Sequence, residues 1–356
     1  MKKLLAIPIL IMVLITGCST EEQQIDNEHQ AFAMNDVPEV LAENLAIPWS
    51  IAKYDETFYL TEREGSIVKV ENGEIERQTV HFKKELATAS EAGLLGLVLA
   101  PDFSKSNTAY AYYTYEDSSG QFNRIVTLRL EKNAWTEDKL LLDKIPSGPR
   151  HHGGRLKIGP DEKLYATTGD ASVEEIAQDL TSLGGKILRM NLDGSLPSDN
   201  PFPNSYVYSY GLRNPQGITW SPDGTLYSTD HGNNRNDEVN KIEAGLNYGW
   251  PIIEGNEQKE GLVPPLFTSG VEETWAPSGM DYEDGNLYVG ALRGTALLQF
   301  NLETGEKQEI ITSLGRIRDV LIEGNYLYFI SNNTDGRGAP QPNDDKLYRI
   351  ELSVSN

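Results

Sequence analysis

The sequence of 356 residues contains little cysteine, little positive charge and few long apolar segments. Its single cysteine excludes an intrachain disulfide framework and a cysteine-rich zinc site. The 53 Asp and Glu residues outnumber the 31 Lys and Arg residues, and the formal net charge of −22 argues against a nucleic-acid partner, whose phosphates need a basic surface. The sequence also lacks a P-loop, a Gly-x-Gly-x-x-Gly motif and a Gly-x-Ser-x-Gly elbow, so three common enzyme classes lose their usual support.

The one long apolar segment lies at the N-terminus. A short basic start precedes residues 4–15, which are too few to span a bilayer, and the segment ends in an Ile-Thr-Gly-Cys sequence at Cys18. This sequence resembles the lipobox of bacterial lipoproteins. The resemblance implies a signal peptide over residues 1–17, lipidation of Cys18, and an extracytoplasmic protein attached to the bacterial cell membrane only through its lipid. A plain secretory signal with an incidental cysteine is the alternative. The polar, acidic residues 18–38 predict a flexible tether.

From residue 39 onward the sequence repeats. A turn sequence followed by a short apolar or aromatic strand recurs six times, with tyrosines at positions 59, 110, 165, 227, 288 and 328. Asp-Gly and Gly-Asn pairs supply the positive φ angles that tight hairpins need. These repeats predict an all-β fold, a six-bladed β-propeller forming a single domain over residues 39–356. A two-sheet sandwich is the alternative, but six unequal repeats favour the propeller. We expect the last strand, over 346–352, to pair with residues 40–52 and close the ring.

One connection contains two adjacent histidines. His151 and His152 precede a glycine pair and a short strand. A histidine near its ordinary pKa can accept a proton at neutral pH, so His151 is the first candidate for a general base. A loop histidine bonded to the backbone is the alternative. A metal site made by the pair is less favoured, because adjacent residues of a strand point to opposite faces.

Two basic segments indicate an anion site. Arg213 and Asn214 together offer a charge and an amide, which suit a ligand with carboxylate or carbonyl groups, although the segment alone could equally be a blade turn with a surface arginine. Arg316 and Arg318 project from the same face if they lie on a strand, and Arg293 can join them. In so acidic a sequence, these arginines suggest either acidic protein partners or an anionic ligand.

Residues 230–251 are rich in carboxylates, asparagines and glycines. This composition favours a hard cation such as Ca²⁺, which takes six to eight oxygen ligands. A solvated acidic loop is an equally good interpretation of the segment alone, and no EF-hand spacing is present.

Taken in this order on a β repeat, the segments resemble the soluble quinoprotein aldose dehydrogenases of the glucose/sorbosone dehydrogenase family. The resemblance covers residues 44–352 and includes the segments 91–97 and 184–194. It implies a propeller that binds pyrroloquinoline quinone (PQQ) with Ca²⁺ at one end of its channel. Such an enzyme oxidises the C1 hydroxyl of an aldose sugar to a lactone and passes the electrons to an external acceptor.

The resemblance also implies residue roles. His151 falls on the base that removes the C1 hydroxyl proton. The positions expected to bind the cofactor are Glu91, Gln178, Arg213, Asn214, Arg293, Arg316 and Arg318. The positions expected to bind metal are the Gly232 and Asn233 carbonyls for the cofactor Ca²⁺, and Glu238 and Tyr248 for a second, structural Ca²⁺. Glu91 stands where relatives often have Gln, and its carboxylate is expected to repel PQQ unless it is protonated or bound to Ca²⁺.

Two other functions remain open at this point. A Ca²⁺-dependent propeller hydrolase, such as a sugar lactonase, requires a channel metal held by side-chain carboxylates. A non-catalytic, surface-binding propeller requires only the fold, and the Glu91 departure is consistent with it.

Overall fold

The computed structural model describes residues 37–352. The predicted signal peptide, Cys18 and all but the last two residues of the predicted tether lie outside this range. The described chain is almost entirely β-structure, with one short α-helix, α1 (Phe103–Ser106), and one 3₁₀-helix (Glu174–Ala177). None of the helices in residues 37–352 is long and apolar enough to cross a membrane. The all-β prediction is therefore confirmed.

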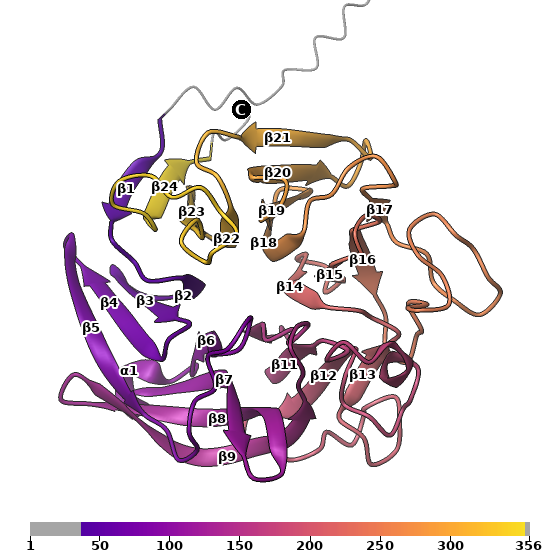
Figure 1. Cartoon of the computed structure of the whole chain (residues 1–356), viewed down its shortest axis with the longest axis horizontal. Helices are drawn as coiled ribbons and strands as arrows, with labels where there is room; N and C mark the ends of the chain where they lie inside the picture. The colour runs from indigo at the N-terminus through magenta and orange to yellow at the C-terminus, as the bar shows by residue number, and fades with distance from the viewer. Residues whose placement is uncertain (1–36, 353–356) are drawn as a thin grey trace, which may run out of the picture. The chain divides into compact units, whose positions relative to one another are not determined.

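The strands form five sheets arranged around a common centre (Figure 1). Four of the sheets have four strands each. The first of these, in chain order, contains β10 (Leu156–Ile158), β11 (Lys163–Thr168), β12 (Lys186–Asn191) and β13 (Val207–Tyr210). The second contains β14 (Pro215–Trp220), β15 (Leu226–Asp230), β16 (Glu238–Ile242) and β17 (Phe267–Thr268). The third contains β18 (Pro277–Glu283), β19 (Asn286–Ala291), β20 (Ala296–Asn301) and β21 (Lys307–Ile311).

The fourth sheet closes the ring with strands from both ends of the described chain. It contains β22 (Ile317–Glu323), β23 (Tyr326–Ser331), β24 (Leu347–Glu351) and β1 (Glu39–Ala42). Strand β1 pairs antiparallel with β24, with Val40 opposite Tyr348. The predicted pairing of the last strand with the N-terminal segment is thus confirmed.

The fifth sheet has eight strands, because two four-stranded runs join edge to edge. The first run contains β2 (Pro48–Tyr54), β3 (Thr57–Glu62), β4 (Ser66–Glu71) and β5 (Glu74–His81). The second contains β6 (Leu94–Leu99), β7 (Thr108–Asp117), β8 (Gly120–Glu131) and β9 (Ala134–Pro146). Strand β5 pairs parallel with β9, with Val80 opposite Trp135. The propeller class is confirmed, whereas a count of six separate blades stays a prediction.

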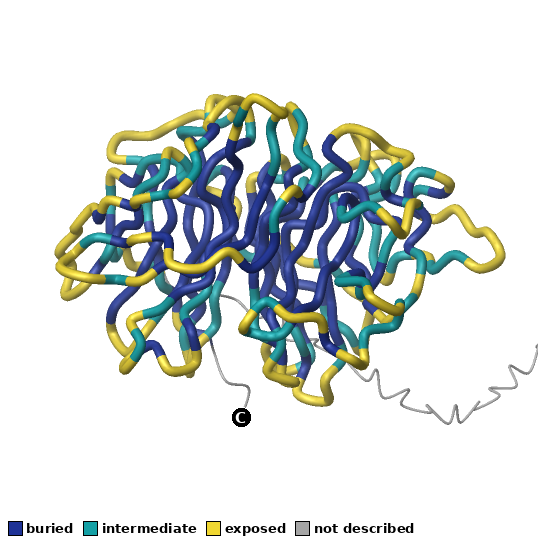
Figure 2. Tube along the Cα trace, turned by 90° about the horizontal axis from the view of Figure 1, so that it is seen from below, coloured by how far each residue is buried: buried dark blue, intermediate teal, exposed yellow. Residues whose placement is uncertain are grey.

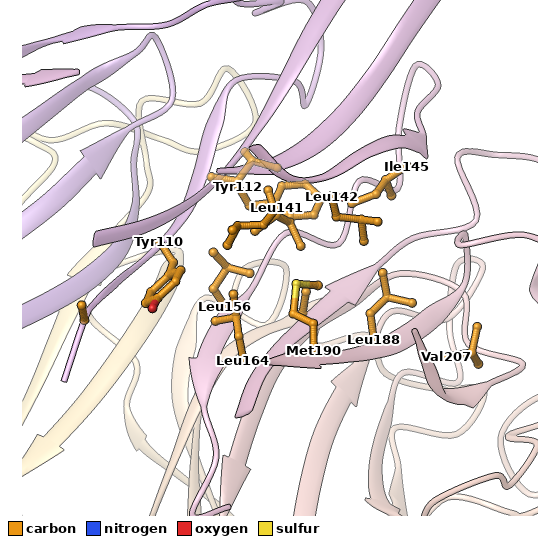
Figure 3. Close-up of a cluster of buried hydrophobic side chains, with 14 of the residues drawn as sticks. Tyr110, Tyr112, Leu141, Leu142, Ile145, Leu156, Leu164, Leu188, Met190 and Val207 are labelled. Atoms are coloured by element: carbon orange, nitrogen blue, oxygen red, sulfur yellow. The ribbon is translucent and has the colours of Figure 1, made fainter. Parts of the chain in front are cut away.

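The core lies between neighbouring sheets. In one cluster, Tyr112 and Leu141 of the eight-stranded sheet face Leu188 and Met190 of the next sheet (Figure 3). Aromatic and β-branched residues suit such pleated, buried surfaces. The strands are buried in the interior, and the loops at the two ends of the strands carry most of the exposed residues (Figure 2). Loop residues that are buried are therefore candidates for a site.

Candidate active site

A cavity of about 650 Å³ lies where the five sheets meet. Nine of the residues singled out in the sequence line it: Glu91, His151, Arg213, Asn214, Gly232, Asn233, Arg293, Arg316 and Arg318. Gln178, Glu238 and Tyr248 do not line it. The fold therefore brings together segments from all parts of the propeller, as expected of loops around one channel mouth.

The lining of this cavity is strongly basic. It contains seven arginines, including Arg63, Arg150 and Arg337, which the sequence patterns did not single out. Only two acidic residues, Glu91 and Asp237, line it. In a protein of net charge −22, this concentration of guanidinium groups favours an anionic ligand.

His151 lies in the loop between β9 and β10, and its side chain is largely buried. Its Nδ1 is 2.7 Å from Oδ1 of Asp170, whose carboxylate is fully buried. The same carboxylate accepts hydrogen bonds from the Ser172 amide (2.7 Å) and the Trp250 indole (2.9 Å). Because an ionised carboxylate only accepts, Nδ1 donates to it, and the Nε2 lone pair of His151 is left to accept a proton.

The pairing of His151 with Asp170 depends on a close approach of two loops. A Cβ atom added to Gly169 would lie 2.0 Å from the His151 carbonyl oxygen, so only glycine fits between them. Sequence patterns missed Asp170. The available signal was its position directly after Gly169 at the end of β11, where a polar residue follows a buried strand.

Arg316 and Arg318 are buried at the start of β22, and their guanidinium groups are held by fixed acceptors. Arg316 donates to Asp335 (2.8 Å), and Arg318 donates to Gln216 (2.8 Å) and Asn332 (2.9 Å). Burial and neighbouring arginines lower the pKa of Arg318 to about 9, although the Asp335 charge raises it. The one carboxylate of Asp335 lies 2.8 Å from Arg316 and 4.0 Å from Arg318, so two buried guanidinium groups share a single negative charge and a bound anion would stabilise them.

Arg213 and Asn214 are positioned by one buried carboxylate. Both oxygens of Asp230 accept main-chain amides, from Arg213 at 2.8 Å and from Asn214 at 2.6 Å. The Arg213 guanidinium lies over the Trp250 ring at 5.2 Å, and its buried Nε has no hydrogen-bond partner among the described residues. The Asn214 side chain accepts the Gly153 amide at 3.0 Å, which ties it to the histidine loop.

Glu91 corrects one expectation from the sequence. Its Oε1 is 2.8 Å from Nη1 of Arg337, and its Oε2 accepts the main-chain amide of His151 at 3.1 Å. Burial alone raises the pKa of Glu91, but the Arg337 charge and the His151 amide together lower it to about 2. The carboxylate is therefore paired with an arginine, which offsets the repulsion of PQQ that the sequence led us to expect.

Gln178 also differs from expectation. Its side-chain nitrogen donates to the Trp250 carbonyl (2.6 Å) and its oxygen accepts from Asn247 (2.7 Å). It supports the loop that places Trp250 against Asp170. The structure thus puts it behind the site, away from the lining where cofactor contact was expected.

The four expected metal positions divide into two pairs. Gly232 and Asn233 line the cavity. The Glu238 carboxylate on β16 accepts from Gly255 (3.0 Å) and Asn240 (3.1 Å), while the Tyr248 hydroxyl donates to the Lys241 carbonyl (2.7 Å). Within residues 37–352, no group of three or more His, Cys, Asp or Glu side chains is arranged to hold a metal.

The fold and the cavity together define the class of protein: a β-propeller in which a histidine–aspartate pair lies at an arginine-lined cavity. Residues 45–348 match the model of the glucose/sorbosone dehydrogenase family, and the chain belongs to this family. It is 28% identical to the aldose sugar dehydrogenase YliI of Escherichia coli K12 over 341 residues, which cover 84% of this chain and 90% of that protein.

Two further comparisons bear on the cofactor. The chain is 34% identical to quinoprotein glucose dehydrogenase B of Acinetobacter calcoaceticus over 255 residues, which cover 62% of this chain and about half (53%) of that protein. The PQQ-bound aldose sugar dehydrogenase of Streptomyces coelicolor superimposes with a TM-score of 0.82 at 34% identity, covering 89% of this chain and 97% of that structure. The family suggested by the sequence is thereby confirmed.

Proposed function

We propose that the protein is a PQQ-dependent dehydrogenase that oxidises the C1 hydroxyl of aldose sugars to lactones and passes the electrons to an external acceptor. The observation that carries this proposal is that His151, paired with buried Asp170, shares one cavity with seven arginines. A proton acceptor beside an anion site is what oxidation of an alcohol by a polyanionic quinone requires.

The residues present fit PQQ. The cofactor has three carboxylates, and the lining offers seven guanidinium groups against two acidic side chains. The buried, unpartnered Nε of Arg213 is a donor that a ligand carboxylate or carbonyl would satisfy. The volume of about 650 Å³ lies within the range of small-molecule sites. When bound, PQQ supplies a quinone that accepts two electrons from the sugar.

The protein's own residues would handle the proton. His151 accepts the C1 hydroxyl proton at Nε2, and Asp170 stabilises the imidazolium that results. Ser172 and Trp250 hold the carboxylate in place, so that the ring keeps one orientation. We further propose that the carbonyls of Gly232 and Asn233 hold a Ca²⁺ beside the cofactor. Glu238 and Tyr248 remain the candidates for a second, structural Ca²⁺.

Location is proposed from the sequence alone. The lipobox-like sequence at Cys18 supports a lipid-anchored, extracytoplasmic enzyme. Metabolic labelling with a fatty acid tests this: label is expected in the wild-type protein and not in Cys18→Ser. Equal labelling of both proteins would contradict the anchor at this cysteine.

The test of function is a PQQ titration of the purified, cofactor-free protein with and without Ca²⁺, followed by reduction of an artificial acceptor in the presence of aldoses. We expect a PQQ-induced absorbance change and sugar-dependent turnover. His151→Ala should abolish turnover, whereas His81→Ala, at an exposed histidine on β5, should not. No absorbance change with PQQ would reject the proposal. Hydrolysis of lactones without PQQ would favour the lactonase, although residues 37–352 lack the carboxylate cluster that it requires.

A further inference from the structure

Two loops from different sheets meet at the cavity through one ion pair. Glu91 lies in the loop between β5 and β6, and Arg337 lies in the loop between β23 and β24. Oε1 of Glu91 is 2.8 Å from Nη1 of Arg337. The carboxylate is the more buried partner, with 19% of its side chain exposed against 51% for the arginine. Both residues line the cavity.

The second oxygen of the same carboxylate reaches the histidine loop. Oε2 of Glu91 accepts the main-chain amide of His151 at 3.1 Å. His151 has a φ of 64°, in the left-handed region that residues other than glycine adopt at a cost. A contact that holds this amide therefore helps to keep the backbone of the candidate base in an unfavourable conformation.

We propose that Arg337 is a positioning residue of this site. It acts through Glu91 in two ways: it cancels a negative charge inside an anion-binding cavity, and it orients the carboxylate that holds the His151 main chain. The inference rests on the proposed PQQ-dependent function and adds to it a residue whose role is defined by this chain's glutamate.

The chemistry of the pair explains why the two residues depend on each other. Arg337 and the His151 amide both donate, and a carboxylate offers each of them an acceptor oxygen. A glutamine at position 91 has one acceptor oxygen, so its NH₂ group would face one of the two donors. Other charged or titratable groups near the pair are Arg63, His152 and Asp335.

The experiment compares four proteins: wild type, Arg337→Gln, Glu91→Gln and the double variant. The PQQ dissociation constant is measured by fluorescence titration from acid to neutral pH. Arg337→Gln leaves the Glu91 carboxylate unpaired beside the anionic PQQ. The dissociation constant at neutral pH should therefore rise roughly tenfold, which corresponds to about 1.4 kcal/mol of binding free energy. The difference should shrink at acid pH, because the Glu91 carboxylate of Arg337→Gln has lost the arginine that lowers its pKa and takes up a proton more readily. Glu91→Gln should bind no more weakly than wild type, and the double variant should recover to within about twofold.

Two control variants separate charge from folding. Arg337→Lys keeps the charge and should retain most of the affinity. Arg129→Gln removes an arginine whose side chain is about half exposed on β8, and it should leave PQQ binding unchanged. A merely structural pair would behave differently, because either single substitution would then weaken binding and the double variant would not recover.

Two results would overturn the proposal: wild-type affinity in Arg337→Gln at neutral pH, or a double variant that binds as weakly as Arg337→Gln. If the wild-type protein does not bind PQQ, the proposed function fails. The ion pair is then tested by thermal unfolding of the four cofactor-free proteins. Non-additive shifts in Tm would support the link between the loops, and additive shifts would reject it.

Discussion

The carboxylate of Asp170 offers a direct test of the candidate base. Asp170→Asn keeps the size of the side chain and removes its charge from beside His151 Nδ1. Proton transfer to His151 creates an imidazolium whose charge lies about 4 Å from the carboxylate, an interaction of at most about 4 kcal/mol at the effective dielectric of protein sites. Since 1.36 kcal/mol corresponds to a factor of ten, we expect turnover to fall by about 10²–10³-fold.

Asp170→Asn should affect turnover alone among the measured quantities. PQQ affinity and the KM for sugar should change little, because Asp170 is buried behind the imidazole. Steady-state acceptor reduction at saturating PQQ gives the turnover, and circular dichroism checks the fold. Asp138→Asn, at an exposed carboxylate on β9, is the matched control. Wild-type turnover in Asp170→Asn would refute the role given to the pair.

Three other predictions concern pH, charge and metal. Burial lowers the pKa of His152 to about 4 from the ordinary value of 6.5. The unfolded chain therefore binds more protons between these two pH values, and the free energy of unfolding should fall by up to roughly 3 kcal/mol as pH decreases through that range. Urea unfolding of His152→Gln should lose part of this pH dependence, and an unchanged dependence would contradict the assignment. Arg318→Gln removes a buried cation and should raise the Kd for PQQ about tenfold or more in fluorescence titrations, with an unaltered Kd as the opposing result. If the Gly232 and Asn233 carbonyls hold Ca²⁺, dialysis against a chelator should release PQQ, and added Ca²⁺ should restore binding; PQQ retained after dialysis would contradict this site.

Much of the fold was predictable because its repeat is local. The six recurring tyrosines all lie on the second strand of a four-stranded antiparallel run; the strands are β3, β7, β11, β15, β19 and β23. Turn residues and apolar strands recur together, so the pattern is readable from short windows of sequence. The parallel pairing of β5 with β9 was not predictable. It joins segments without a shared turn, and it depends on how closely two neighbouring runs approach.

The site residues likewise fall into those that local sequence patterns identified and those that they missed. His151, Arg213 and Arg318 belong to unusual local segments, and the structure places all three in the cavity lining. Asp170 was missed because its contact with His151 depends on how the segments before β10 and after β11 lie beside each other, and Arg337 was missed because its partner Glu91 comes from a distant part of the chain. Glu91 and Arg337 become neighbours only when the ring closes, and a single sequence contains no record of that contact.

The pairing of β1 with β24 has a consequence for how the protein is made. The strand Glu39–Ala42 emerges first from the ribosome among the described strands, and its partner Leu347–Glu351 emerges last. Until then, β1 has unpaired main-chain groups on an open edge, which is a template for pairing with another chain. Such distant contacts also form slowly. During synthesis the first strand therefore keeps this open edge until residues 347–351 have emerged, and truncation near the C-terminus would leave the edge open permanently.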